Sequence, residues 1–215
     1  MKYREIREQV IEASLKAQKL GLIRGTSGNI SVRCEDSGLI AISPTSIPYE
    51  DLTPELVPLV DLDGNVVDGT TKPSSECPMH TAVMRNRKDV NAVVHTHSKF
   101  STILSIIGQE LPLITIPLLG YAPTPAPIVP FEIPGSAALA EAVVKGLGEK
   151  GSAVLMENHG MLAVGSTIDK AMTCTEYIEE GAEITFYCRL AGKVKGIDPQ
   201  VLAEMIAILK SGRAL

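Results

Sequence analysis

The chain has 215 residues, of which 45% are hydrophobic and 21% are charged, and its formal net charge at pH 7 is −5. This composition excludes a disordered chain and predicts an ordinary globular protein with a single domain over residues 1–215. The slightly acidic balance indicates neither nucleic acid nor an anionic membrane as a partner.

The sequence predicts neither a membrane span nor a secretion signal. Prolines interrupt the one long apolar run, at Pro117, Pro123, Pro125, Pro127 and Pro130. The charged segment 1–12 lacks the apolar centre of a signal peptide. We therefore expect a cytoplasmic protein.

The first predicted element is a helix over residues 3–20. Its apolar residues recur with a period of about 3.6, namely Ile6, Val10, Ala13, Leu15, Ala17 and Leu20. Gly21 is expected to end this helix. A glycine-rich turn then leads into a strand at 30–33, and a second strand, 39–43, stops before Pro44.

A hairpin and a second helix are expected next. Residues 59–62 and 66–68 flank an Asp-Gly-Asn sequence at 63–65, which is typical of a tight hairpin turn. A helix should begin near 74–75, where two serine hydroxyls can cap its first turn, and continue to about Arg87.

The rest of the chain is expected to mix helices with short strands. The proline-rich span 112–134 should be extended and irregular, and packed on the protein because it is hydrophobic. The other expected elements are strands at 90–94, 153–156 and 161–164, and helices at 99–107, 137–150, 168–190 and 199–210. Because several strands are joined by hairpins, we expect a three-layer α/β/α fold with a predominantly antiparallel central sheet.

His95 and His97 directly follow the apolar strand 90–94. Residues two apart in a strand point to the same face, so both imidazoles should leave the sheet side by side. This arrangement suits the binding of one divalent metal ion. Strands this apolar normally carry valine or isoleucine at such positions, so the pair needs an explanation.

A third histidine and a carboxylate can complete such a site. His159 lies in a turn between two short strands, where Gly160 allows a tight reversal, and Glu76 lies near the start of its helix. A lone histidine is more often a core or surface residue than a ligand. Three histidines with a carboxylate instead favour a catalytic divalent site, most often zinc. The fourth histidine, His80, is one turn after Glu76 and is expected to support a ligand rather than to be one.

The four cysteines show neither metal-ligand spacing nor the density of a disulfide framework. Cys174 and Cys188 fall in a predicted helix and are expected to be free, buried thiols. Cys77 neighbours Glu76, but no feature near it clearly lowers its pKa, so a nucleophilic role is not expected.

Three other segments have the residues of an anion-binding backbone. Segment 25–31 offers glycine-freed amides and polar side chains, 43–46 supplies hydroxyls at a strand end, and 74–75 lie at a helix N-terminus. The same residue types also simply make turns and caps. Together with the metal set they predict a small phosphorylated substrate. None of them forms a Walker or dinucleotide motif, which argues against a nucleotide.

Five motifs follow one another along the chain. They are Gly25-Thr-x-Gly-Asn-x-Ser31, Ile42-Ser-Pro-Thr-Ser-Ile-Pro-Tyr-Glu50, Pro73-Ser-Ser-Glu76, Val94-His-Thr-His97 and Asn158-His-Gly160. This set resembles the class II aldolase/adducin family, over about residues 5 to 190. Within that family, the resemblance is greatest to the aldolases of fuculose 1-phosphate.

The resemblance implies a metal-dependent aldolase that splits a small ketose 1-phosphate into dihydroxyacetone phosphate and an aldehyde. In the family, three histidines bind zinc, and a glutamate is both the fourth ligand and the general acid/base. By position these are His95, His97, His159 and Glu76. Manganese or cobalt would suit the same ligands. The family's phosphate cradle falls on Gly28, Asn29, Thr45, Ser46, Ser74 and Ser75, with Ser46 in place of a glycine often seen there.

The resemblance also implies partners, and one departure from the family. Members are typically homotetramers with active sites at subunit interfaces, and neither nucleic acid nor membrane is implied. The family's catalytic tyrosine, given by a neighbouring subunit, falls on Ile116 here, and the tail 210–215 has no aromatic residue for a second one. Tyr121 is the candidate to replace the first, with a packing role as the alternative. A less polar aldehyde, as from a deoxy or methylthio pentulose phosphate, would suit the apolar stretch 113–131.

Two alternatives stay open. A sugar-phosphate 4-epimerase or a decarboxylase of phosphorylated sugar acids uses the same fold. Epimerases of the family usually carry Asp at the Glu76 position, so Glu76 favours an aldolase. A non-catalytic, adducin-like module would have lost the metal ligands, all four of which are present in this sequence.

Overall fold

The computed structural model describes residues 3–211. The strands are β1 (Asn29–Arg33), β2 (Ile40–Ile42), β3 (Leu59–Val60), β4 (Val66–Asp68), β5 (Ala92–Thr96), β6 (Ile128–Val129), β7 (Ala153–Met156) and β8 (Gly160–Gly165). The helices are α1 (Arg4–Lys19), α2 (Cys77–Asn86), α3 (Lys99–Ile106), α4 (Ile116–Tyr121), α5 (Ala137–Leu147), α6 (Ile168–Leu190) and α7 (Pro199–Lys210), with short 3-10 turns at Tyr49–Asp51 and Pro54–Leu56.

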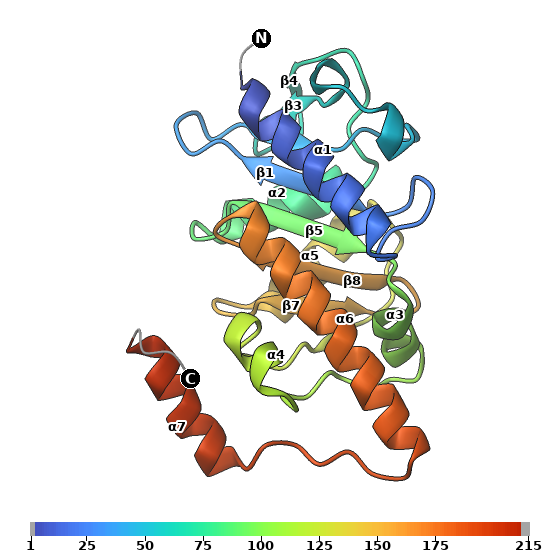
Figure 1. The fold of residues 1–215 in the computed structure, drawn as a ribbon. Coiled ribbons are helices and arrows are strands. Elements are labelled where there is room, and N and C mark those ends of the chain that lie inside the picture. The colour runs from blue at the N-terminus through green and yellow to red at the C-terminus, as the bar shows by residue number, and fades with distance from the viewer. Residues whose placement is uncertain (1–2, 212–215) are drawn as a thin grey trace.

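The strands form one sheet in the order β4-β3-β2-β1-β5-β8-β7-β6. All neighbouring pairs are antiparallel except β6 and β7, which run parallel. Helices α2 and α5 cover one face of the sheet, and α1, α3, α4 and α6 cover the other (Figure 1). The predicted three-layer α/β/α fold with a mostly antiparallel sheet is therefore confirmed.

Strand β5 lies near the middle of the sheet and is buried on both sides. Val93 packs in the core cluster under α2 and α5, whereas Val94 packs in the cluster under α1 and α6. This alternation is the ordinary consequence of strand geometry. It places His95, two residues after Val93, on the face of the sheet that α2 covers.

Two helix predictions need correction. Leu15 and Leu20 fit the helical period of α1, but their exposed fractions are 40% and 47%, so they lie off its buried stripe. Helix α2 begins at Cys77 rather than at the predicted serines. The Ser74 hydroxyl accepts the backbone N–H of Glu76, which holds that segment in a turn, and Glu76 itself takes the N-cap position.

The span 112–134 is not entirely irregular, contrary to the prediction. It contains α4, whose first turn is capped by the Thr115 hydroxyl accepting from the Leu118 N–H, and whose second residue is a proline. Proline is tolerated there because the first turn has no need of its N–H. The span also contains β6, which pairs with β7. Its packing on the protein is as expected, since Leu118 and Leu119 are buried in the core cluster of α3 and α6.

The C-terminal helix α7 follows an extended connection and lies beside α4 in Figure 1. Its Leu202 and Met205 are partly buried against the cluster that also contains Leu118. Of the aromatic-free tail discussed above, residues 212–215 lie outside the described residues. Among the described residues, no helix combines the length and the apolar character that crossing a membrane requires.

Candidate metal centre

Four side chains from three distant parts of the chain meet at one end of the sheet. Glu76 precedes α2, His95 lies near the end of β5, His97 follows that strand, and His159 lies in the turn between β7 and β8. One ligand atom from each residue lies within 4.8 Å of all the others. Because β5 and β8 are adjacent and antiparallel, with Thr96 opposite Met161, the turn that carries His159 lies beside His97.

The backbone around His159 is shaped for this approach. Asn158 has a left-handed conformation (φ 53°), which reverses the chain. At Gly160, a Cβ atom would lie 2.3 Å from the Thr96 carbonyl oxygen and 3.2 Å from the His97 Cα. Only glycine allows the two histidine segments to come this close.

The four groups point their ligand atoms at one another. His95 Nε2 lies 3.0 Å from His97 Nε2 and 3.0 Å from Glu76 Oε2, and His159 Nε2 lies 3.3 Å from Glu76 Oε1. His95 Nδ1 donates to the Met161 carbonyl at 2.8 Å, so Nδ1 carries a proton and Nε2 is left to face the site.

This donor set fits a divalent cation. Acceptor atoms converge on one point, and Glu76 Oε1 is buried with no hydrogen-bond donor among the described residues. Such a convergence needs positive charge, from a proton on His95 Nε2 or from a metal ion. Imidazole nitrogens and carboxylate oxygens are ligand atoms that catalytic zinc sites use.

The pKa shifts agree with this view. Burial alone would raise the pKa of Glu76, but its contacts with His95 and Asn29 outweigh burial and hold that pKa well below the ordinary value. Burial and the neighbouring imidazoles lower the pKa of His97 to about 4, and burial with His95 also lowers that of His159. These two rings are therefore neutral at pH 7, which is the form that binds metals.

The site opens into a cavity of about 310 Å³. Its lining includes Glu76, His97 and His159, while His95 lies behind them, fully buried. The lining also brings together every residue of the implied phosphate cradle, Gly28, Asn29, Thr45, Ser46, Ser74 and Ser75, joined by Thr26, Ser27, Pro44 and Pro134.

Two residues of the implied phosphate cradle, Gly28 and Ser46, have left-handed backbone conformations. Gly28 has φ 74°, and a Cβ there would lie 2.7 Å from the His95 carbonyl oxygen. The turn therefore packs directly against β5. Ser46 also has a left-handed conformation (φ 60°), which glycine adopts with less strain.

The sequence did not predict two hydrogen bonds at this site, one that holds the turn at Gly28 and one that holds Glu76. The Tyr49 hydroxyl donates to the Gly28 carbonyl at 2.7 Å. Asn29, considered above only for phosphate, donates from Nδ2 to Glu76 Oε2 at 2.9 Å. Both contacts join segments more than 20 residues apart, and no local pattern reveals them.

The structure places Tyr121 elsewhere. Its side chain is not in the lining of the cavity, and its ring stacks on Tyr177 with centroids 5.0 Å apart. Ile116, at the start of α4, is 56% exposed. Within one chain, neither residue lines the cavity.

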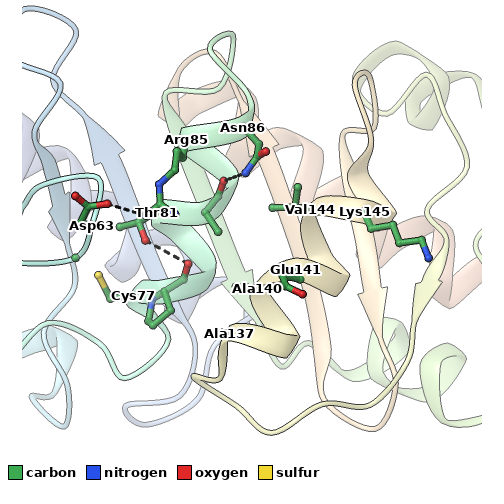
Figure 2. A pocket seen from close by; sticks show the side chains of 13 residues that line it. Asp63, Cys77, Thr81, Arg85, Asn86, Ala137, Ala140, Glu141, Val144 and Lys145 are labelled. Carbon is green, nitrogen blue, oxygen red and sulfur yellow. Dashed lines mark hydrogen bonds and ion pairs between the residues drawn. The ribbon is translucent and has the colours of Figure 1, made fainter.

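A second hollow lies along α2, in the groove toward α5 (Figure 2). It encloses about 510 Å³ and is lined by Cys77, Thr81, Arg85, Ala140, Glu141 and Lys145, among others. Burial raises the pKa of the Cys77 thiol to about 11, so it is not an activated nucleophile. All four cysteines are free; Cys174 is buried as expected, and Cys188 is only partly buried.

Residues 8–186 match the sequence profile described as the Class II Aldolase and Adducin N-terminal domain. The chain belongs to the class II aldolase and adducin family. It is 39% identical over 189 residues to a 5-deoxy-D-ribulose 1-phosphate aldolase of Bacillus thuringiensis serovar kurstaki, covering 88% of each chain. It is 33% identical over 206 residues to a 5-methylthioribulose-1-phosphate/5-deoxyribulose-1-phosphate aldolase of Escherichia coli, covering 96% of this chain and 94% of the relative. A solved structure of an L-fuculose 1-phosphate aldolase superposes with a TM-score of 0.91 and 28% identity, covering 96% of each chain.

Proposed function

We propose that this protein is a divalent-metal-dependent aldolase that cleaves a small ketose 1-phosphate into dihydroxyacetone phosphate and an aldehyde. One observation carries the proposal. Glu76, His97 and His159, with His95 buried directly behind them, form one side of a cavity whose other side consists of hydroxyls and turn backbone. A metal-stabilised anion and an anchored phosphate are what this reaction needs.

His95, His97 and His159 would hold the metal ion, with Glu76 as the fourth ligand. When bound, the ion would stabilise the negative charge that cleavage of the C3–C4 bond leaves on the substrate. Within residues 3–211, Glu76 Oε1 meets no hydrogen-bond donor, so this oxygen can carry the proton that C3 takes up after cleavage, while Asn29 holds Oε2. Glu76 is the proposed catalytic residue.

The phosphate group would bind at the opposite wall of the cavity. Thr45, Ser46 and Ser75 offer hydroxyl groups there, and the turn at Gly28 offers backbone N–H groups. Ser74 binds the backbone N–H of Glu76 through its hydroxyl, so it would act by fixing the wall. A phosphate held in this way sets the distance from the reacting carbons to Glu76.

We propose a 5-deoxy- or 5-methylthio-pentulose 1-phosphate, or a fuculose 1-phosphate-like sugar, as the substrate class. The first two are named for the relatives described above. The loop that gives Pro134 to the cavity also carries Phe131 and Ile133, whose apolar side chains are exposed. An apolar substrate end would suit this surface better than a hydroxylated one.

We also propose zinc as the metal and a homotetramer as the working form. Large exposed apolar side chains are found on α3, α4, the 131–133 loop and the end of α6, which favours burial against other copies. They are Ile106, Ile107, Ile116, Tyr121, Phe131, Ile133, Tyr187 and Leu190. Metal analysis of the purified protein tests the first point. Light scattering tests the second, with a mass of about four times 22.9 kDa expected.

The deciding experiment measures dihydroxyacetone phosphate released from a panel of ketose 1-phosphates, before and after treatment with a chelator. We expect release from at least one 5-deoxy or 5-methylthio sugar, loss of release after chelation, and recovery on adding Zn²⁺, Mn²⁺ or Co²⁺. Cleavage that survives chelation would refute the metal's role. Conversion to an epimer or loss of CO₂ would favour the epimerase or decarboxylase, and failure to retain any metal would favour an adducin-like module.

A further inference from the structure

Behind Glu76, three buried polar side chains form a hydrogen-bonded chain that leads away from the cavity. Asn29 Nδ2 lies 2.9 Å from Glu76 Oε2, and Asn29 Oδ1 lies 2.5 Å from His80 Nε2. The Ser31 hydroxyl lies 2.7 Å from His80 Nδ1. Glu76 and these three residues are all buried. A polar atom that faced the wrong partner there would therefore lose its hydrogen bond without water to replace it.

This series of hydrogen bonds forms because the strand spacing on β1 and the helix spacing on α2 bring its members together. Asn29 and Ser31 are two residues apart on β1 and therefore point to the same face of the sheet. Glu76 and His80 are four residues apart at the start of α2, so they lie on one side of that helix. Strand β1 is also the neighbour of β5, with Asn29 opposite His95.

Chemistry fixes the direction of each hydrogen bond. A carboxylate only accepts, so the Asn29 atom that faces Glu76 must be the amide nitrogen. The amide oxygen then faces His80, so His80 Nε2 must carry a proton. Because burial keeps this ring neutral, lowering its pKa to about 3, His80 Nδ1 must accept the proton of the Ser31 hydroxyl.

We propose that His80 is a positioning residue for Glu76: its Nε2–H locks the Asn29 amide in the orientation that presents N–H to Oε2. With the amide reversed, Asn29 Oδ1 would face Glu76 Oε2, and two acceptors would repel each other at hydrogen-bond distance. The lock thus keeps Oε2 occupied and leaves Oε1 as the oxygen available to a metal ion or a proton. The kinetic test below rests on the proposed reaction and the Co²⁺ tests rest on the proposed metal site, whereas the NMR test rests on neither.

The first test measures the proton positions on His80 in the metal-free wild-type protein, by ¹⁵N NMR of its side chain. We expect a neutral ring protonated at Nε2 throughout pH 6 to 8. A ring protonated at Nδ1, or a doubly protonated ring at pH 7, would overturn the proposal, because neither leaves this hydrogen-bond direction intact. This measurement needs neither a variant nor a substrate.

The second test compares His80→Leu, His80→Gln and Met84→Leu. Leucine cannot donate, whereas the glutamine amide N–H can replace Nε2–H. Met84→Leu is a matched packing control. Met84 is fully buried on the same helix, and its side chain makes no hydrogen bond to Asn29, His80 or Ser31. The readouts are Co²⁺ affinity, the visible absorption spectrum of the Co²⁺ protein, and kcat and KM separately.

We expect His80→Leu to lose roughly 10- to 100-fold in Co²⁺ affinity or kcat, with a changed Co²⁺ spectrum. His80→Gln should recover most of this loss, and Met84→Leu should match the wild type. A wild-type spectrum and kcat in His80→Leu, or no rescue by His80→Gln, would overturn the proposal. If His80→Leu does not fold, Ser31→Ala takes its place, with a smaller loss of the same kind expected; no loss there would overturn it. If no sugar phosphate is cleaved, the Co²⁺ spectra still decide.

Discussion

Two hollows adjoin helix α2, one at its N-terminal end and one along its length, and the larger one has fewer groups suited to catalysis. The groove toward α5 encloses about 510 Å³, against about 310 Å³ for the cavity at Glu76. In the groove, Arg85 lies 3.4 Å from Asp63 in an exposed ion pair, and no imidazole is in the lining (Figure 2). The cavity instead collects polar groups from several distant segments, and Asn29, Ser74 and Glu76 among them are buried. Convergence of such groups, rather than volume, identifies the site.

The contrast is sharpest between two consecutive residues. Glu76 faces the cavity, where His95 and Asn29 hold its pKa below the ordinary value although it is buried. Cys77 faces the groove, where burial meets no compensating partner and raises the thiol pKa to about 11. One peptide bond separates an acid kept ionised from an acid kept neutral. The partners that each side chain meets therefore decide its ionisation state.

The largest effect is expected from Glu76→Gln, with Glu141→Gln in the groove as its matched control. Removing the carboxylate removes the proton-transfer group, so kcat for cleavage should fall by roughly 10²- to 10⁴-fold. Glu141 is exposed and lines only the groove, so its variant should stay within about twofold of the wild type. The measurement is release of dihydroxyacetone phosphate. Equal losses in both variants would break the comparison.

The next effect concerns the contact between the two histidine segments. In Gly160→Ala, the new Cβ would meet the Thr96 carbonyl oxygen at 2.3 Å and push His159 away from His97. A displacement of this kind can cost on the order of 100-fold in rate. Gly120→Ala is the control, because a Cβ at Gly120 meets nothing within 4 Å. Metal content and kcat are measured for both; a fully active Gly160→Ala protein would disprove the proposed close fit.

A matched pair of threonines tests the phosphate wall. Thr45→Val removes a hydroxyl from the cavity, and Thr81→Val removes one from the groove, where it donates to the Pro78 carbonyl. Losing one hydrogen bond to a phosphate, worth about 1.5–3 kcal/mol, should raise KM roughly 10- to 100-fold in Thr45→Val with less change in kcat. Thr81→Val should leave KM unchanged. The assignment fails if both variants shift KM alike.

The sequence predicted the parts of this site that depend on local periods. The strand period placed His95 and His97 on one face, and the position of Glu76 at a helix start was found from its flanking serines. The sequence could not place Asn29 against Glu76 or Tyr49 against Gly28, because those contacts depend on how β1 and the 3-10 turn pack in three dimensions.

The errors have similar causes. Prolines suggested an irregular chain over 112–134, but Pro117 falls at the second residue of α4, where a helix accepts it. Ser74 offered a cap, yet its hydroxyl binds the Glu76 N–H and shifts the helix start to Cys77. In each case the local sequence permits two structures, and tertiary packing selects the one that the prediction did not choose.

His80 and Cys77 should make the free energy of unfolding depend on pH at opposite ends of the pH scale. His80, facing Glu76 and His95, has its pKa lowered from 6.5 to about 3, so the unfolded chain binds a proton that the folded chain does not. Its stabilising contribution is therefore lost as pH falls from about 6.5 toward 3, by about 1.4 kcal/mol per pH unit. Cys77, whose pKa is raised from 9.0 to about 11, loses its contribution as pH rises through that interval.

Urea unfolding at several pH values, with a chelator present, measures this difference. His80→Gln should flatten the acid side only, and Cys77→Ala should flatten the alkaline side only. A variant that changes the opposite side would contradict the assignment of that pKa. The two curves together separate the buried imidazole behind the cavity from the buried thiol of the groove.

The smallest effect is expected at Cys77 itself, and it completes the contrast with Glu76. Cys77→Ala should leave cleavage within about twofold of the wild type and cost about 1 kcal/mol of stability, since the thiol is buried and only packs. In the wild type, a thiol-specific reagent at pH 8 should label Cys34 and Cys188, which are partly exposed, well before Cys77. At that pH, a thiol with a pKa of about 11 is ionised in only about one molecule in a thousand. Rapid labelling of Cys77 together with loss of activity would mean that the groove, and not only the cavity, takes part in the reaction.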